Sequence, residues 1–428
     1  MVTRRLAHEH WDHNRSRRYQ GGIEHGSTNV TFFRLLAERY HSRRRRLVPD
    51  KTNSRRDFLR IAGAAAAGTI LAPSPATAAQ QPPHGDRTMT NRAKQIFTSG
   101  HRLGLGGVPL GNEFEVVTDE DAIKTLEASW KAGIRYFDVS PWYGLGAAER
   151  RFGMFLHNQP RDSYLISTKV GKLLKASPKN DARSNFPYGN SPNNVVFDYS
   201  ADGVKRSIED SPQRLGIDRI DVVFVHDISS DNKLLPRPWQ EEFAIAMKGA
   251  FPTLSRMREE GIIKAWGIGV NTPEPILRVM QEADPDVCLL ASQYSLIDHA
   301  NALNNLFPVA RQKNMSFVVG SSLNAGFITG SSRYNYGQNS WKIPAEHIVK
   351  RDKLRAIANQ FGVDLRTAAL QFSSAPDVAV SLVVGAHTEA QALANASSMM
   401  ATVPPGFWEE LKRQRLIEDN APLPQFPA

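Results

Sequence analysis

Residues 221–227 read Asp-Val-Val-Phe-Val-His-Asp, an apolar run closed at each end by polar residues. β-Branched and aromatic residues fill it without polar alternation, which is typical of a strand buried on both faces of a parallel sheet. Similar runs recur on both sides of it, at 106–110, 136–140, 164–170, 265–270, 287–293, 316–320 and 379–384. The sequence therefore predicts eight buried strands.

Amphipathic stretches with the helical period separate these runs. They predict helices at 119–132, 200–214, 251–260, 273–283, 346–361 and 388–400. Thr118 is placed to cap the first helix and Gly133 to end it, whereas Pro212 is expected to kink or shorten the second. Alternating strands and helices indicate βα units, and eight of them favour a single-domain (β/α)8 TIM barrel, expected at residues 96–415, over a doubly wound sheet.

Two predicted loops are longer than usual, at 172–199 and 331–345. Both follow predicted strands, and the loops after barrel strands form the face on which active sites of TIM barrels lie. The second loop carries Tyr334, Tyr336 and Trp341, which favours a role as a wall of a substrate pocket. For the first loop, a pocket wall and an ordinary surface insertion remain equal alternatives.

The net charge of +10 is concentrated at the start of the chain. Residues 1–78 hold 15 Lys and Arg against 6 Asp and Glu, so this leader accounts for +9 of the net charge. The rest of the chain is almost neutral, which argues against a large basic face for phosphate backbones. No nucleic-acid partner is expected.

A signal sequence is predicted at residues 54–78. Ser-Arg-Arg-Asp-Phe-Leu-Arg at 54–60 precedes an apolar, small-residue run at 61–72 and an Ala-Thr-Ala site at 76–78, the three parts of a secretory signal peptide. The paired arginines resemble the twin-arginine signal, so the export machinery is an expected partner and the protein is expected to be periplasmic or secreted. The run is shorter than the roughly 20 residues that a bilayer span needs, so no stable membrane anchor is expected.

Residues 1–53 form a basic extension without sustained periodicity, which is expected to be disordered and has no assigned function. Two alternatives to export remain open. The segment 54–78 could be a basic tail beside a marginal helix, or translation could start at Met89 and give a cytoplasmic form.

The chain contains one cysteine, Cys288, so it can form neither an intrachain disulfide nor a cysteine-based metal site. Cys288 lies in the apolar run 287–290, which predicts a buried and inert thiol. The sequence predicts no metal site.

Four reactive side chains fall at or just beyond the ends of three consecutive predicted strands: Asp138, Tyr143, Lys169 and His226. An unpaired Asp or Lys in a buried strand is costly, so we expect these groups to meet at one rim of the barrel. Singly, each has a structural explanation, as a cap, a surface lysine or a core histidine. Asp138 with Asp227 could also serve a glycosidase, and Lys169 a Schiff-base aldolase.

The motifs around these residues resemble those of the aldo-keto reductases. In order they are Gly-Ile-Arg-Tyr-Phe-Asp at 133–138, Trp-Tyr-Gly at 142–144 followed by Glu149, Ser-Thr-Lys-Val-Gly at 167–171, 221–227, and Gly-Ile-Gly-Val-Asn at 267–271. The resemblance covers roughly residues 96–400. Residues 103–112 and 197–200 look most like the aldose 1-dehydrogenase branch, which includes threo-aldose, fucose and pyridoxal dehydrogenases.

The resemblance implies an oxidoreductase that transfers a hydride between a nicotinamide cofactor and the C–OH or C=O group of an aldose or similar small alcohol or carbonyl substrate. In this mechanism Tyr143 is the general acid–base, because a neighbouring Lys169 ammonium lowers the pKa of its phenol toward neutrality. Asp138 pairs with Lys169, and His226 orients the substrate oxygen. A non-catalytic, nicotinamide-sensing barrel remains the alternative from another functional class.

The resemblance also implies cofactor contacts. Asn271 and Gln293 correspond to residues that hydrogen-bond the nicotinamide carboxamide, and Ser292 lies beside them. The segment 323–330, which begins at Leu323, corresponds to the loop that closes over the pyrophosphate. Gly320 departs from the pattern, since many members carry a tyrosine there that stacks on the nicotinamide.

The last predicted strand bears on the choice between NAD and NADP. NADP-preferring members commonly carry Lys and Arg after this strand to bind the 2′-phosphate. Here Gly385 and Gln391 occupy those positions, with Asn395 beyond them, and only His387 could add positive charge. The sequence therefore favours NAD, or the use of both cofactors.

Overall fold

The computed structural model describes residues 91–178, 186–335 and 343–424, all within the unit Pro83–Ala428. The predicted extension at 1–53, the predicted signal at 54–78 and Met89 lie outside the described residues, as do Tyr336 and Trp341. Among the residues described, no helix is both long and apolar enough to cross a bilayer.

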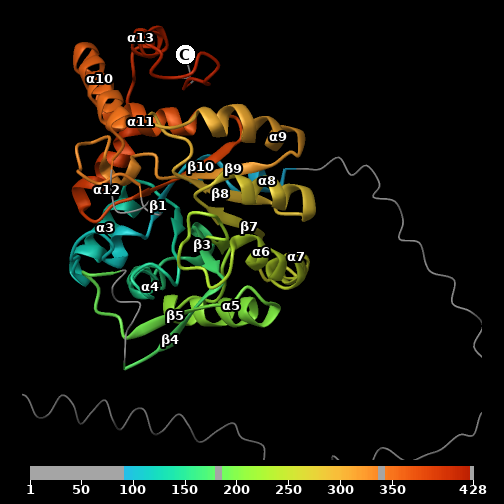
Figure 1. Cartoon of the computed structure of the whole chain (residues 1–428). Helices are drawn as coiled ribbons and strands as arrows, with labels where there is room; N and C mark the ends of the chain where they lie inside the picture. The colour runs from blue at the N-terminus through green and yellow to red at the C-terminus, as the bar shows by residue number, and fades with distance from the viewer. Residues whose placement is uncertain (1–90, 179–185, 336–342, 425–428) are drawn as a thin grey trace, which may run out of the picture. The chain divides into compact units, whose positions relative to one another are not determined.

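Eight parallel strands close into a barrel with helices around it (Figure 1). Around the barrel the order is β1 (Leu103–Gly106), β10 (Ala379–Gly385), β9 (Ser316–Gly320), β8 (Val287–Ala291), β7 (Ala265–Val270), β6 (Val222–His226), β3 (Leu165–Val170) and β2 (Tyr136–Asp138). The predicted single-domain (β/α)8 barrel is confirmed. Seven of the eight predicted strands match the observed ones to within two residues.

The first strand was placed wrongly. It was predicted at 106–110, but β1 covers Leu103–Gly106, and Pro109–Gly111 form a short 3-10 helix, η3. The strand has only four residues, and two of them are glycines, so its apolar pattern is weak. A glycine is required at Gly104, because a Cβ there would meet the Tyr136 ring at 2.4 Å.

Helices surround the barrel and shield it from solvent. The longer ones are α3 (Asp119–Lys131), α4 (Ala147–Leu156), α5 (Ala201–Leu215), α6 (Trp239–Lys248), α7 (Ala250–Glu259), α8 (Pro273–Glu282), α10 (Ala345–Phe361), α11 (Leu365–Ser374), α12 (Glu389–Ser398) and α13 (Pro405–Arg413). Shorter helical segments are α2 (Arg92–Ile96), η2 (Ser99–His101), η4 (Arg161–Ser163), η6 (Ala302–Leu306), α9 (Phe307–Gln312) and η7 (Asn324–Gly326). The six predicted helices match to within two residues.

Two local helix signals can be checked against the structure. The Thr118 side chain accepts a hydrogen bond from the Asp121 N–H at 3.1 Å, which confirms it as the cap of α3. Pro212 does not shorten α5, since the helix continues to Leu215 before Gly216 ends it with a left-handed conformation.

The predicted loop at 172–199 contains two strands that the sequence analysis missed. β4 (Lys172–Ala176) pairs antiparallel with β5 (Asn193–Phe197), with Lys172 opposite Phe197. Gly171, at φ +99°, turns the chain out of β3 into this hairpin, and a Cβ there would meet the Tyr199 ring at 2.2 Å. The Tyr199 hydroxyl donates to the His226 carbonyl at 2.8 Å and so ties the end of the hairpin to β6.

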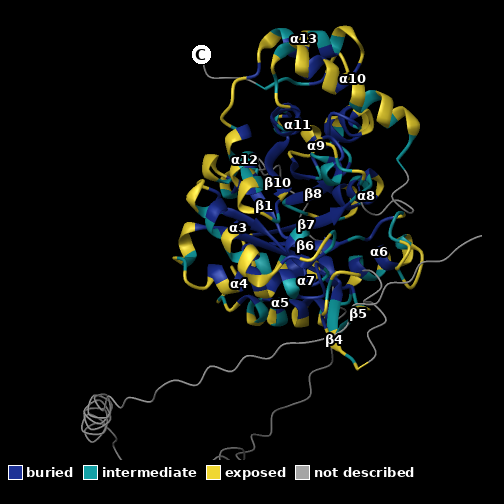
Figure 2. Cartoon of the chain, turned by 90° about the vertical axis from the view of Figure 1, so that its left-hand side faces the viewer, coloured by how far each residue is buried: buried dark blue, intermediate teal, exposed yellow. Residues whose placement is uncertain are grey.

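The core has an inner and an outer part. Inside the barrel, buried side chains from alternate strand positions fill the lumen, and Phe97, just after α2, packs edge-on against Tyr136 at the start of β2. The outer part lies between strands and helices, so that the helices are buried on one side and exposed on the other (Figure 2). Cys288 is fully buried there, as predicted, and burial raises the pKa of its thiol to about 12.

Candidate active site

The four predicted reactive residues lie on neighbouring elements at one end of the barrel. Asp138 is the last residue of β2, Lys169 is the second-last residue of β3, and His226 is the last residue of β6. These strands are adjacent in the order β2-β3-β6, and Lys169 is in register with Phe224 of β6. Tyr143 follows in the turn between β2 and α4. The carboxyl ends of parallel strands thus bring the four side chains together, as expected.

Lys169 and Asp138 form a buried ion pair. The Lys169 Nζ donates to Asp138 Oδ2 at 2.7 Å and to the Val139 carbonyl at 2.9 Å, while Ser167 Oγ donates to Asp138 Oδ1 at 2.6 Å. Burial lowers the pKa of Lys169, and the Asp138 carboxylate opposes that shift. Such a pair is tolerated inside a protein only when its polar atoms are hydrogen-bonded, as they are here.

Tyr143 lies against both Lys169 and His226. The Lys169 Nζ is 4.6 Å from the centroid of the Tyr143 ring. The Tyr143 and His226 rings are 5.8 Å apart and nearly perpendicular, at 87°. The Tyr143 phenol therefore lies beside both the Lys169 ammonium and the His226 imidazole.

Both ring nitrogens of His226 have a polar neighbour. Nδ1 lies 3.1 Å from Ser140 Oγ, and Nε2 lies 3.3 Å from Asp227 Oδ2. Burial, with the nearby Lys172 and Lys169 charges, lowers the pKa of His226 well below its usual value, so the ring is neutral at pH 7. When Ser140 Oγ donates to Nδ1, the hydrogen of the neutral ring lies on Nε2, on the side of the Asp227 carboxylate.

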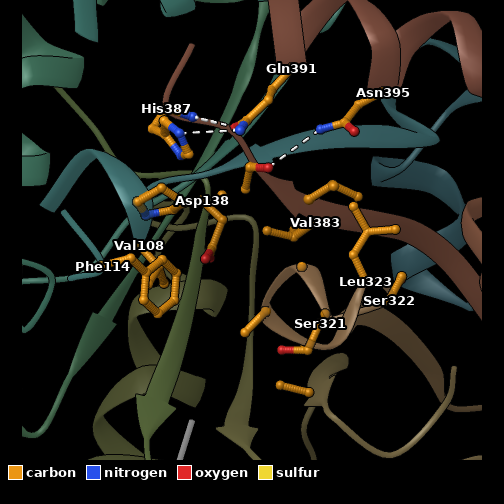
Figure 3. A pocket seen from close by; sticks show the side chains of 18 of the residues that line it. Val108, Phe114, Asp138, Ser321, Ser322, Leu323, Val383, His387, Gln391 and Asn395 are labelled. Carbon is orange, nitrogen blue, oxygen red and sulfur yellow. Dashed lines mark hydrogen bonds between the residues drawn. The ribbon is translucent and has the colours of Figure 1, made fainter. Parts of the chain in front are cut away.

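A groove opens beside these residues across the ends of β1, β8, β9 and β10 (Figure 3). We call it the mouth groove. It is lined by Asp138 and Tyr143 and by four of the residues predicted to bind the cofactor: Leu323, Gly385, Gln391 and Asn395. The Asn395 amide donates to the Gly385 carbonyl at 3.4 Å, and the Gln391 side chain accepts from the His387 N–H at 3.1 Å. The mouth groove thus extends from Asp138 and Tyr143 to the end of β10, the last strand.

The mouth groove contains buried polar atoms that lack hydrogen-bond partners among the described residues. Ser322 lines it, is almost fully buried, and its Oγ has no hydrogen-bond partner among the described residues. The Nε atoms of Arg333 and Arg366, which also line the groove, are likewise buried and unpaired within the described part of the chain. Buried polar atoms without partners are rare in native proteins, and a phosphate-bearing ligand would satisfy them.

Three other predicted cofactor residues lie apart from this lining. The Gln293 amide donates to the Asn271 carbonyl at 2.7 Å, and the Asn271 amide donates to Asp231 Oδ2 at 2.9 Å. Ser292 is buried in a left-handed conformation, and its Oγ is also unpaired within the residues described. The structure brings Asn271 and Gln293 together but places none of the three among the groove-lining residues.

Within the stretch after the last strand His387 is the only residue that could add positive charge, but the mouth groove also receives cations from other elements. Arg333 and Arg366 line the same groove. Arg333 comes from the segment after β9 and packs over the Phe114 ring at 4.5 Å, and Arg366 lies in the first turn of α11. His387 itself is paired with Glu115 at 2.6 Å. The pattern of NADP-preferring members places cations after the last strand, whereas Arg333 and Arg366 come from other elements.

The loop at 331–345, predicted as a pocket wall, lines the mouth groove through Arg333, whereas Tyr334, the one of its three aromatic residues that is described, does not. Tyr334 is buried against Phe327 and His347 instead of lining the groove. The groove is lined by Gly320, which stands where many family members have a stacking tyrosine, together with Leu289 and Ala291. The lining also includes the aromatic residues Phe114 and Tyr143. Among the described residues, no group of three His, Cys, Asp or Glu side chains is arranged to hold a metal ion.

Comparisons with known proteins show the family to which this chain belongs. Residues 102–414 match the model of the aldo/keto reductase family. The chain is 35% identical over 327 residues to D-threo-aldose 1-dehydrogenase of a Pseudomonas species and 36% identical over 332 residues to pyridoxal 4-dehydrogenase of Microbacterium luteolum, in each case covering 74% of this chain and 94% of the relative. A solved aldo-keto reductase from Bacillus halodurans has the same fold, with a TM-score of 0.57 and 22% identity over 74% of this chain and 92% of that one. This chain therefore belongs to the aldo/keto reductase family and is an NAD(P)-dependent oxidoreductase.

Proposed function

We propose that this enzyme interconverts the C–OH and C=O groups of an aldose or a similarly small alcohol or carbonyl compound. Its proposed catalytic residues are Asp138, Tyr143, Lys169 and His226. The observation that carries the proposal is the buried Lys169 ammonium, fixed by Asp138 at 2.7 Å and lying 4.6 Å from the Tyr143 ring beside the mouth groove. The two relatives named above act on an aldose and on pyridoxal, which supports a substrate of this size.

Each residue has a distinct task in the proposed mechanism. Tyr143 donates a proton to the carbonyl oxygen during reduction and takes the hydroxyl proton during oxidation. The Lys169 ammonium stabilises the phenolate that remains on Tyr143, and Asp138 holds the ammonium in place. The neutral His226 donates a hydrogen bond from Nε2 to the same substrate oxygen and so fixes its position.

The mouth groove is the proposed cofactor site. Leu323, Ser322, Gly385, Gln391 and Asn395 would hold the dinucleotide, with Asn271, Ser292 and Gln293 near its nicotinamide end. When bound, the nicotinamide supplies or accepts the hydride, and the protein contributes position and electrostatics.

We propose that the enzyme uses both NAD and NADP. Gly385 and Gln391 lack the charge that a 2′-phosphate requires, which favours NAD. Arg333 and Arg366 line the same groove and favour NADP. A measured preference of a hundredfold or more for either cofactor in kcat/KM would contradict this proposal.

The test of the proposed function is turnover of NAD and NADP with a panel of aldoses and simple alcohols, measured beside binding of the cofactors alone. Steady turnover supports the dehydrogenase. Tight cofactor binding with no turnover of any substrate would favour the nicotinamide-sensing alternative. Family membership supports hydride transfer over the glycosidase and Schiff-base aldolase, for which Asp138, Asp227 and Lys169 were the candidate residues.

We also propose that the protein is exported by the twin-arginine route, on the strength of residues 54–78 alone. Since that route carries folded proteins and free cofactor is scarce outside the cytoplasm, the nucleotide would be bound before export. Mass spectrometry of the native exported protein tests this, because retained NAD or NADP is expected and an empty protein would contradict it.

A further inference from the structure

A second buried charged pair lies immediately beside the reacting residues, and the mechanism above does not use it. Lys172, the first residue of β4, donates from Nζ to Asp227 Oδ2 at 2.5 Å. The Lys172 side chain is 3% exposed and that of Asp227 is 19% exposed. A lysine this deeply buried is unusual, and its position next to His226 points to a role in the site.

The Asp227 carboxylate lies beside the imidazole nitrogen that is proposed to bind the substrate oxygen. The same Oδ2 that binds Lys172 lies 3.3 Å from His226 Nε2. A substrate oxygen bound at Nε2 would therefore lie next to this carboxylate oxygen. A hydroxyl group on the neighbouring carbon of the substrate is then placed to donate to Oδ2, because it enters together with the reacting oxygen.

The backbone holds Asp227 in a conformation that few non-glycine residues adopt. Its φ is +50°, its N–H donates to the Gly269 carbonyl at 2.9 Å, and its carbonyl accepts from Asn232 at 3.0 Å. Such strain persists only where the surrounding structure fixes it, and it gathers at functional sites. The carboxylate is thus fixed beside the end of β6, and its side chain remains 19% exposed.

An aromatic face completes the arrangement. The Lys172 Nζ lies 4.7 Å from the centroid of the Trp142 ring, and Trp142 directly precedes Tyr143. Phe186 packs against the Trp142 ring in an edge geometry, with the ring centroids 4.9 Å apart. A carboxylate, an ammonium and an aromatic face are together suited to the hydroxyl groups and C–H faces of a polyol.

We propose that Asp227, held by Lys172, is a specificity-determining residue that recognises a hydroxyl group on the carbon next to the reacting carbon. The substrates are then α-hydroxy aldehydes and the corresponding vicinal diols, of which aldoses are one group. This inference rests on the proposed function and narrows its substrate class. The rival explanation is that the pair only anchors the β4–β5 hairpin to the end of β6.

The experiment compares lactaldehyde with propanal, which differ by the hydroxyl group at C2, in the wild type and in Asp227→Asn. We expect the wild type to favour lactaldehyde, and the variant to lower the lactaldehyde-to-propanal ratio of kcat/KM by about ten- to a hundredfold, which is the effect of losing one charge-assisted hydrogen bond. Most of that change should appear in KM. The control is Asp202→Asn, whose carboxylate is 95% exposed beside Lys205 on α5, and it should keep the wild-type ratio.

Equal losses for both aldehydes in Asp227→Asn would overturn the inference and indicate an anchoring role. So would a wild type that turns over both aldehydes without preference. If Asp227→Asn does not fold, Lys172→Gln provides the second test and should lower the same ratio. A wild type that turns over no carbonyl or alcohol with either cofactor would overturn the proposed function, and this inference with it.

Discussion

At the scale of single residues, the site depends on charges that are expensive to bury. The Lys169 side chain is 1% exposed, and Asp138 compensates its charge. Asp138→Asn leaves the ammonium without its partner, so we expect a loss of about 3–5 kcal/mol in the free energy of unfolding and loss of turnover. Thermal and denaturant unfolding measure the first effect.

The double variant Asp138→Asn/Lys169→Met is the matched control, because it removes the unpaired charge as well. It should unfold at a higher denaturant concentration than Asp138→Asn while remaining inactive. A double variant that is less stable than the single one would show that the loss comes from disturbed packing and not from the buried charge.

Glu113 gives a prediction about pH. Burial raises its pKa to about 7, and the charge of Lys172 only partly offsets the shift. The folded protein therefore keeps a proton on Glu113 that the unfolded chain releases above its ordinary pKa, and stability is lost as the pH rises through about 7. Glu113→Gln removes this loss, so its Tm relative to wild type should rise between pH 5 and pH 8.

Unfolding of both proteins at pH 5, 6, 7 and 8 tests this. Glu409→Gln, on an exposed position of α13, is the control and should show a constant difference from wild type. A constant Tm difference for Glu113→Gln as well would contradict the assignment.

Arg366 allows a test of cofactor choice at one position. It lines the mouth groove, and its Nε is buried and unpaired within the described part of the chain. If it contacts the 2′-phosphate, Arg366→Ala should raise KM for NADP by about tenfold and leave KM for NAD nearly unchanged. The exposed Lys353→Ala serves as control. An equal effect on both cofactors would rule out recognition of the 2′-phosphate.

At the scale of elements, apolar periodicity predicted the strands that are buried on both faces and failed where that signal is weak. β7 and β9 were predicted to the residue, because their runs are continuous and bounded by turns. β1 has four residues, two of them glycine, so the apolar run just after it was mistaken for the strand. The β4–β5 hairpin was missed because its strands are half exposed and lie within a stretch rich in Asn, Pro and Ser.

Gly171 is the position where that hairpin depends on a single residue. Its φ is +99°, and a Cβ would meet the Tyr199 ring at 2.2 Å, so Gly171→Ala should displace Tyr199 and the start of β4. Gly133→Ala is the matched control, because φ there is +89° with nothing within 4 Å of the added atom. We expect Gly171→Ala to lower Tm and kcat/KM clearly more than Gly133→Ala. Equal effects in the two variants would mean that backbone strain alone accounts for the loss.

At the scale of the whole molecule, topology determines what the sequence could not predict. The rim residues could be placed together because βα units put every strand end on one face. Arg333, Arg366 and Lys172 could not, because they reach the site from elements that the barrel pattern leaves unspecified. Their common sequence feature is a cation beside a turn or helix start, which occurs too often in any chain to identify a site.

The most direct test of the central claim is single-turnover hydride transfer by Tyr143→Phe, measured together with its cofactor affinity. Phenylalanine retains the ring that lies against Lys169 and His226 and lacks only the hydroxyl that carries the proton. The account predicts turnover reduced by at least a thousandfold and an affinity for NAD and NADP within about threefold of wild type. Near-normal turnover in this variant would contradict the assignment of Tyr143 as the proton donor and acceptor.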